Sequence, residues 1–338
     1  MSLPCDDLDA ALRWEILSSA SGLAGELDDM GADIGPVGSG ARLSVLESDA
    51  RWSAEYHRLS AGGQLIGIIP VFTCHARSWP NPLYVPARPQ IIPAHCVLVG
   101  GRDGLASSLR LTAPARSGRT FRLIIEKLAS IYRQRGQLLA FPFFPVDELE
   151  AIRSSGLPLD IRTEGRDARL DALLGDWSRT LRSKARSTLR RDAADAARLG
   201  IVTRISTWDE IASWAAPLVS DHNRLKGLPD HPRLVDHRVR QWERCEGMQV
   251  LAFTAAAGKA AGVLVAVMWQ DWMDLQEIGL PPGSGEQRRC LYAQLIAHLP
   301  VAAGSKRGIR RVRAGTEATT AKAARGATFQ LIGSGISC

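Results

Sequence analysis

Two nearly uninterrupted apolar runs, 68–72 and 263–269, stand out against the mixed pattern of the rest of the chain. Each run follows a five-residue stretch with a glycine at both ends, Gly63 to Gly67 in one case and Gly258 to Gly262 in the other. A strand-like segment precedes both stretches. Two extended runs joined by a glycine-marked turn are typical of a β-hairpin, so the pattern predicts one hairpin in each half of the chain.

The same succession of elements follows both hairpins. A helical apolar period covers 121–135 in the first half and 288–303 in the second. Each helix pattern leads to a basic residue, a glycine and a further strand, predicted at 137–143 and 309–314. The chain therefore repeats one β-β-α-β arrangement.

This repeat predicts that residues 51–145 and 248–332 superpose as related α/β units, with a cleft between the two halves. At 338 residues and 45% hydrophobic content, the chain can bury a core in each half without disulfides or metals. The predicted fold class is α/β (α+β), with a first domain over 1–160 and a second over 161–338. Each is expected to hold a mixed, mostly antiparallel sheet flanked by helices.

Cysteine placement and hydropathy bear on the compartment. The six cysteines lie far apart and form no Cys-x-x-Cys pair, which is typical of reduced thiols in a cytoplasmic protein. The first fourteen residues are acidic and amphipathic, unlike a secretory signal peptide. The longest apolar stretch, 260–269, is too short to cross a bilayer, so no membrane span is expected.

Basic residues outnumber acidic ones by 42 to 35, and their placement matters more than the excess. Two interpretations of the densest cluster remain open: a solvated basic face, or guanidinium groups that bind phosphate oxygens. A second basic cluster, from Lys306 to Arg313, adds weight to a polyanionic ligand. The first cluster recurs at spacings of three and four on a helix predicted over 178–199 with Ser178 as its N-cap: Arg179, Arg182, Arg186 and Arg190.

The segment from Trp177 to Arg191, with Gly200-Ile201 after it, resembles the basic helix that opens the C-terminal half of tandem GNAT-fold acyltransferases. The similarity is to their Fem-like and cellulose-biosynthesis-type branch. It continues through 221–227, the hairpin at 258–269 and Tyr292. It ends with Gly315-Thr316 and a lysine followed by a glycine, in the pattern of that family. About half of the chain is covered.

The resemblance implies two tandem GNAT-like domains that transfer an activated acyl group onto an amine. In one branch the donor is an acyl-CoA, and in the Fem-like branch it is an aminoacyl-tRNA. The donor's phosphates need an anion cradle, and the candidate is Gly283-Ser284-Gly285, which enters a predicted helix at its N-terminus. Standard CoA-binding members carry Gln or Arg where this chain has Leu280, and this departure favours aminoacyl-tRNA.

Acid–base candidates lie on the predicted strand 272–279. Strict alternation puts Asp274 with Gln276 on one face and Glu277 with Leu275 on the other. Glu277 is a candidate for a partly buried carboxylate that accepts a proton from an ammonium group, and Asp274 is a second candidate. A structural salt bridge from Glu277 to an arginine is the competing interpretation.

Lys322 and Arg325 follow the last strand on a predicted short helix over 319–324. In the family that the chain resembles, this lysine and the residues after it close the donor site. A fixed cation there would stabilise the developing oxyanion or bind a donor phosphate, as Arg182, Arg186 and Arg190 are expected to do. A surface pair without a catalytic role is the alternative.

The acceptor pocket is assigned on weaker signals. Three histidines share the segment 222–237, but two prolines there break the helical period, so no metal site is expected. The residues expected to line the acceptor or acyl pocket are His222, Lys226, Trp269, Trp272 and Thr316.

The sequence thus predicts a monomeric or weakly dimeric N-acyltransferase without a tightly bound cofactor. It would transfer an aminoacyl group from aminoacyl-tRNA to the amine of a small-molecule or cell-wall-precursor acceptor. An acyl-CoA-dependent enzyme of the same fold is the first alternative. A noncatalytic RNA-binding or scaffold protein is the second, although the stacking motifs of RNA modules are missing and aromatic residues make up only 6% of the chain.

Overall fold

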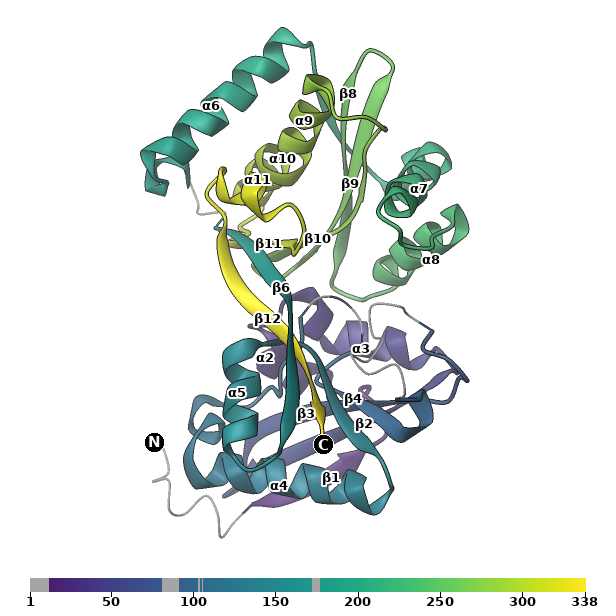
Figure 1. The fold of residues 1–338 in the computed structure, drawn as a ribbon, viewed down its shortest axis with the longest axis vertical. Coiled ribbons are helices and arrows are strands. Elements are labelled where there is room, and N and C mark those ends of the chain that lie inside the picture. The colour runs from purple at the N-terminus through teal and green to yellow at the C-terminus, as the bar shows by residue number, and fades with distance from the viewer. Residues whose placement is uncertain (1–11, 81–90, 103, 105, 172–176) are drawn as a thin grey trace. The chain divides into compact units, whose positions relative to one another are not determined.

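The computed structural model describes residues 12–80, 91–102, 104, 106–171 and 177–338 (Figure 1). The chain forms two compact units. Unit 1 comprises the residues up to Gly165 together with Leu331–Cys338, and unit 2 comprises Arg166–Gln330. The chain therefore passes from one unit to the other twice, and the segment 331–338 belongs to unit 1. The boundary at 160/161 inferred from the sequence stays a prediction.

In unit 1 the strands follow the order β1-β2-β3-β4-β5-β12-β6. The pair β4/β5 is parallel, whereas β1/β2, β2/β3, β3/β4 and β12/β5 are antiparallel. Helices cover the sheet on both faces, so each face has a core of its own. Adjacent residues of β3 point into these two cores, Ile68 into one and Ile69 into the other. The elements are β1 (Arg13–Leu17), α2 (Ala24–Gly31), α3 (Gly40–Glu47), β2 (Trp52–Ala61), β3 (Gln64–Cys74), β4 (Cys96–Val99), α4 (Gly118–Gln134), β5 (Leu138–Pro145), α5 (Val146–Ser154), β6 (Leu159–Asp171) and β12 (Thr328–Ser337).

In unit 2 the order is β6-β11-β10-β9-β8-β7, and β10/β11 is the parallel pair. One sheet face packs on α7 and α8 and the other on α9 and α10, as Val263 and Leu264 show by pointing into separate cores (Figure 1). The elements are α6 (Ser183–Arg198), β7 (Val202–Ser206), α7 (Trp208–Leu225), α8 (Pro232–Glu243), β8 (Gln249–Ala257), β9 (Ala260–Trp269), β10 (Trp272–Gly279), α9 (Glu286–Ala293), a π-helical turn (Gln294–His298), α10 (Leu299–Lys306), β11 (Arg311–Gly315) and α11 (Thr319–Ala323).

Both predicted hairpins are present. β2 pairs with β3 across Ala61 and Gln64, and β8 pairs with β9 across Ala257 and Ala260. The intervening turns contain glycines with positive φ, which an L-residue adopts only at a cost. The helices and strands predicted downstream of each hairpin are also found, so the repeated succession of elements is confirmed.

The basic helix begins later than predicted. α6 starts at Ser183, and Trp177–Thr180 form a separate 3-10 turn. Arg182 is the extended N-cap between them, with φ −62° and ψ 152°. The Leu181 side chain packs against Gly326, and a Cβ on Gly326 would lie 2.5 Å from Leu181 Cδ2. Leu181 makes this tertiary contact although it lies outside the helix. Arg179 therefore lies outside the helix that carries Arg186 and Arg190.

A β-bulge corrects the predicted faces of β10. The register with β9 shifts between Leu275 and Glu277, so Asp274 lies opposite Val267 and Glu277 lies opposite Val265. Residues directly opposed in an antiparallel pair point to the same face. Glu277 therefore shares the face of Asp274, toward α7 and α8, and does not lie with Leu275 as strict alternation predicted.

Candidate functional site

The parallel strands of unit 2 separate at the site. β10 and β11 pair only from Trp272 and Arg311 to Asp274 and Arg313. Beyond that point β10 stays paired with β9 as far as Gly279, and β11 stays paired with β6. Both outer ladders have a register shift here, which bends the strands apart. Within the described part of unit 2, the inner backbone edge of β10 beyond Asp274 has no strand partner, and this is the edge that an acyl carbonyl would approach.

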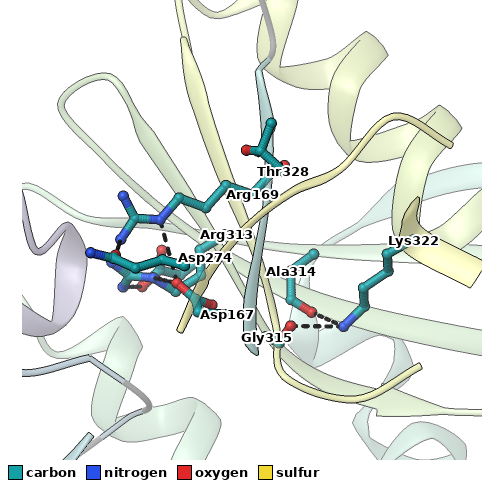
Figure 2. Close-up of polar contacts among 9 residues, drawn as sticks. Asp167, Arg169, Asp274, Arg313, Ala314, Gly315, Lys322 and Thr328 are labelled. Carbon is teal, nitrogen blue, oxygen red and sulfur yellow. Dashed lines mark hydrogen bonds and ion pairs between the residues drawn. The ribbon is translucent and has the colours of Figure 1, made fainter. Parts of the chain in front are cut away.

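A buried charge cluster lies where the strands separate. Arg313 Nη1 donates to Asp274 Oδ2 at 2.9 Å, and Arg313 Nε lies 3.3 Å from Asp167 Oδ2 (Figure 2). The three side chains come from β11, β10 and β6 and are each at most 6% exposed. Burial raises the pKa of Asp274 to about 6, Arg313 opposes that shift, and the Asp167 carboxylate adds to it. A carboxylate with this pKa can accept a proton near neutral pH.

The ring of Trp272 packs against the arginines in and around this cluster. The guanidinium carbons of Arg311, Arg313 and Arg169 lie 4.4, 4.9 and 5.6 Å from the centroid of its ring. Cation–π contacts at these distances fix the guanidinium planes. Trp272, which is 1% exposed, therefore orients the arginines and does not line an open acyl pocket as the sequence predicted.

Lys322 closes the end of β11. Its Nζ donates to Ala314 O and to Gly315 O, the latter at 3.0 Å (Figure 2). The side chain is 4% exposed, and burial lowers its pKa to about 8, while Asp167 and Glu317 act in the opposite direction. Two of its three N–H bonds are used by these carbonyls. The third remains to bind an anion or a developing oxyanion.

His222 and Lys226 project from the last turns of α7. Lys226 forms an ion pair with Glu317, which follows β11. His222 is 5% exposed, and its Nδ1 has no hydrogen-bond partner among the described residues. Burial, together with the charges of Lys226 and Arg288, lowers the pKa of His222 to about 4, so the ring is neutral at pH 7. Thr316, half-buried, lies between β11 and Glu317.

The anion cradle expected from the sequence lies at the glycine turn before α9, and its phosphate-binding role stays a prediction. Gly283 has φ +102°, Gly285 is the N-cap of α9, and a Cβ at either position would meet no atom within 4 Å. The first helical residue is Glu286, which pairs with Arg198 of α6. A carboxylate in the first turn of a helix already uses the favourable field there and repels a phosphate. Ser284 is exposed.

Asp192 is the residue through which α6 binds Arg325, in addition to the Arg198–Glu286 pair. Asp192 accepts from Arg325 Nε at 2.8 Å and from Arg325 Nη2 at 3.0 Å. Arg325 also donates to Ala321 O, so it holds α6 in place instead of facing a donor phosphate. Arg186 donates to Leu181 O, whereas Arg182 and Arg190 are exposed and no ion pair of theirs is found among the described residues.

The remaining predicted site residues lie apart from the cluster. Glu277 Oε1 accepts from Arg238 Nε at 2.5 Å, and the same arginine binds Asp230 through both Nη atoms. This is the salt bridge that the sequence left as the alternative for Glu277. Trp269 ends β9 opposite Trp272 and is buried.

Asp167 was missed by the sequence analysis. It lies within β6, a strand without a hydrophobic alternation strong enough to predict, and only the fold brings it to Arg313. The nearest signal was an acidic residue two positions before an arginine. Across the described ranges, no three His, Cys, Asp or Glu side chains converge on a possible metal position. In those same ranges, no helix combines the length and the apolar character that a membrane crossing requires.

Unit 1 contains a related pair of parallel strands that also separates. β4 and β5 pair from Cys96 and Leu138 to Leu98 and Ala140. Beyond them the chain fills the space itself: Ser107 N donates to Phe143 O of β5 at 3.2 Å, and Ile68 N of β3 donates to Arg110 O at 3.1 Å.

Side chains fix this filling segment. Glu148 Oε1 accepts from Leu109 N at 3.0 Å, and Arg110 donates to Gly38 O at 3.0 Å and to Gly100 O at 3.3 Å. Arg110 is 1% exposed. Backbone hydrogen bonds from segment 107–111 thus occupy the space beyond the paired part of β4 and β5, whereas no such segment pairs with β10 beyond Asp274 among the described residues of unit 2.

Comparison with known proteins establishes the fold. No family model matches the chain, and no curated protein sequence does. Among solved structures, FemX superposes with a TM-score of 0.61 at 10% identity, over 95% of this chain and 96% of that chain. A tandem GNAT protein from the clavulanic acid biosynthesis pathway gives 0.55 at 13% identity, over 96% and 98%.

A third similar structure, L-PGS from Bacillus licheniformis, has a TM-score of 0.50 at 10% identity, over 93% of this chain and 91% of that one. At such identities the likeness shows the fold. The chain has the tandem GNAT fold, with a mixed α/β architecture, as the sequence resemblance implied.

Proposed function

We propose that this tandem GNAT-fold chain is an N-acyltransferase that moves an aminoacyl group from aminoacyl-tRNA to the amine of a small-molecule or cell-wall-precursor acceptor. The observation that carries the proposal is the separation of β10 from β11 in unit 2. It leaves backbone N–H groups beside two buried ionisable groups, Asp274 and Lys322. A hydrogen-bond donor edge, a proton acceptor and a fixed cation are what acyl transfer requires.

The chemistry follows from these groups. The acceptor nitrogen attacks the acyl carbonyl, an N–C bond forms, and the ester C–O bond to the donor's ribose breaks. Asp274 accepts the proton that the nitrogen loses and returns it to the ribose oxygen as that oxygen leaves, so no net proton is consumed. Lys322, with a pKa of about 8, is protonated at pH 7, and its third N–H stabilises the oxyanion.

Two features favour tRNA over coenzyme A as the donor carrier. Glu286 occupies the first turn of α9, where a pyrophosphate would bind, and Leu280 precedes the glycine turn in place of a polar residue. The exposed arginines of α6, Arg182 and Arg190, supply positive charge over a surface longer than one pyrophosphate. The Fem-like resemblance implies the same donor.

Binding of tRNA tests the carrier. Wild-type protein should bind total tRNA with a steep salt dependence, and coenzyme A should not compete. In the double variant Arg182→Gln/Arg190→Gln, affinity should fall, and the slope of log K against log salt should decrease by about one per lost phosphate contact. The matched control is Arg122→Gln/Arg133→Gln, which removes two exposed charges from α4 of unit 1. Equal losses in both variants, or displacement by coenzyme A, would contradict the assignment.

Transfer itself is tested with tRNA charged with labelled amino acids and a mixture of cellular amines. Enzyme-dependent movement of label into an amide is expected, and Lys322→Met should slow it about a hundredfold while leaving tRNA affinity intact. Tight tRNA binding with no transfer to any amine would instead favour the noncatalytic RNA-binding alternative.

A further inference from the structure

We infer that Asp167 is a positioning residue for the reaction: a carboxylate supplied by β6 that sets the charge state of Asp274 and of Lys322 together. This inference rests on the proposed function, in which those two groups handle the proton and the oxyanion. Neither the sequence pattern nor the resemblance pointed to Asp167.

The geometry places Asp167 between the two groups. Its neighbour Ala168 is in register with Gly315, one of the two carbonyl acceptors of Lys322. Its carboxylate lies 3.3 Å from Arg313 Nε, and Arg313 in turn holds Asp274 through Nη1. The Asp167 side chain therefore lies next to Arg313, which binds Asp274, and near the end of β11, which Lys322 binds (Figure 2).

The hydrogen bonding of the cluster is incomplete in a way that suits proton exchange. Asp167 Oδ1 and Asp274 Oδ1 are both buried, and neither has a partner among the described residues. A purely structural salt bridge would satisfy both oxygens of a carboxylate that is 98% buried, because an orphaned charged oxygen costs more than a neutral one. Each carboxylate thus keeps one oxygen for a proton or a water molecule.

The charges around the cluster determine the sign of the effect. The charges of Arg313, Asp167 and Arg169 act on the pKa of Asp274, and those of Asp167, Glu317 and Lys226 act on the pKa of Lys322. Asp167 acts on both groups. Its negative charge disfavours ionisation of Asp274 and favours protonation of Lys322, so it raises the pKa of both groups.

Replacing Asp167 with a neutral residue should therefore lower the pKa of an acid, Asp274, and the pKa of a base, Lys322. In Asp167→Asn the pKa of Asp274 should fall from about 6, and that of Lys322 from about 8, each by about one unit. In the pH profile of transfer, both limbs should shift to lower pH. A merely structural role would lower the maximal rate and leave the limbs in place.

The shifts are measured without any need for turnover. The 13C carboxyl resonance of Asp274 is followed by NMR in Asp-labelled protein, and the 15N resonance of Lys322 in Lys-labelled protein, each assigned by its substitution. Asp167→Glu, which keeps the charge, should leave both titrations in place. Asp271→Asn is the matched control: it removes a carboxylate paired with Arg311 at the edge of the cluster. Asp167→Ser serves as a second neutral variant should the asparagine variant fold poorly.

Downward shifts of both groups in the neutral variants alone would support the inference. No shift, shifts in opposite directions, or equal shifts in Asp271→Asn would overturn it. Should the shifts occur in a protein that transfers no acyl group to any amine, the coupling would stand and the proposed function would fall. Acyl transfer to an amine with both limbs of the pH profile unmoved would support the proposed function and overturn the inference about Asp167.

Discussion

Units 1 and 2 share one strand arrangement but use its central gap differently. In unit 1 Ser107 donates to β5 beside the gap between β4 and β5, and Arg110 donates to two backbone carbonyls. In unit 2 the corresponding gap between β10 and β11 is bordered by Asp274, Arg313 and Lys322, with hydrogen-bonding capacity left over.

This difference indicates which of the two duplicated gaps can hold a functional site. A gap filled by backbone satisfies its N–H and C=O groups internally and adds stability. A gap bordered by buried ionisable groups is costly to keep, because burial holds the pKa values of Asp274 and Lys322 away from their ordinary range. That cost is typical of a site retained for chemistry.

The largest difference predicted between the two units is steric. Gly100 and Gly283 follow β4 and β10 and have φ of +84° and +102°. A Cβ at Gly100 would lie 2.6 Å from Phe144 Cζ, whereas one at Gly283 would meet nothing within 4 Å. Gly100→Ala should therefore destabilise by about 4 kcal/mol, from backbone strain and overpacking, and Gly283→Ala by about 1 kcal/mol from strain alone.

Chemical denaturation of the two alanine variants measures this difference, and hydrogen exchange assigns the loss to a unit. Equal destabilisation would mean that the gap of unit 2 is as full as that of unit 1.

A smaller difference separates two buried histidines. His57 in unit 1 accepts from Trp14 Nε1 at 3.0 Å and bonds Tyr132 OH at 2.7 Å, whereas no bond to His222 Nδ1 is found in the described ranges. At pH 7, His57→Phe should cost about 2 kcal/mol because its partners are left unsatisfied. His222→Phe should cost less than about 1 kcal/mol. Thermal unfolding of both variants is the measurement, and a larger loss at His222 would contradict the comparison.

The pH dependence of these histidines has a definite sign. Burial lowers the pKa of His57 to about 4, from an ordinary 6.5, so the unfolded chain binds the proton first. The free energy of unfolding is therefore unaffected above pH 6.5 and falls by up to about 3 kcal/mol as the pH drops to 4. In His57→Phe the part of this loss that comes from His57 should disappear while the part from His222 remains, as unfolding measured from pH 7 down to pH 4 would show.

The smallest effect expected at pH 7 concerns Lys322. Its lowered pKa means that stability rises with pH between about 8 and 10.5, as the unfolded chain holds the proton longer. Lys322→Met should abolish that rise. At pH 7 it should change stability by less than about 1 kcal/mol, because relief of the buried charge offsets two unpaired carbonyls. Urea unfolding at pH 7 and pH 9.5 tests both statements; a loss of several kcal/mol at pH 7 would make Lys322 structural.

Local signals predicted much of the fold. Glycine turns between apolar runs predicted both hairpins, and the strand over 272–279 matches β10. A short helix over 319–324 was predicted near α11 (Thr319–Ala323). These elements are encoded by neighbouring residues, so periodicity and turn chemistry were sufficient.

What the sequence could not provide depends on contacts between distant residues. The bulge that moves Glu277 to the face of Asp274 is a property of pairing with β9, and Leu181, just before α6, packs against the distant Gly326. Asp167 and Arg313 lie far apart in sequence and meet only because β6 and β11 pair. Tertiary pairing of this kind leaves no periodic trace.

The placement of Leu331–Cys338 in unit 1 has a consequence for synthesis on the ribosome. Unit 2 is one continuous segment, so it can complete its sheet as soon as its own residues have emerged. Unit 1 lacks β12, which lies between β5 and β6, until unit 2 has been made. At typical elongation rates that wait is about 10 to 30 s. During it β5 and β6 present unpaired edges, so the nascent N-terminal half is open to edge-to-edge strand pairing until β12 arrives.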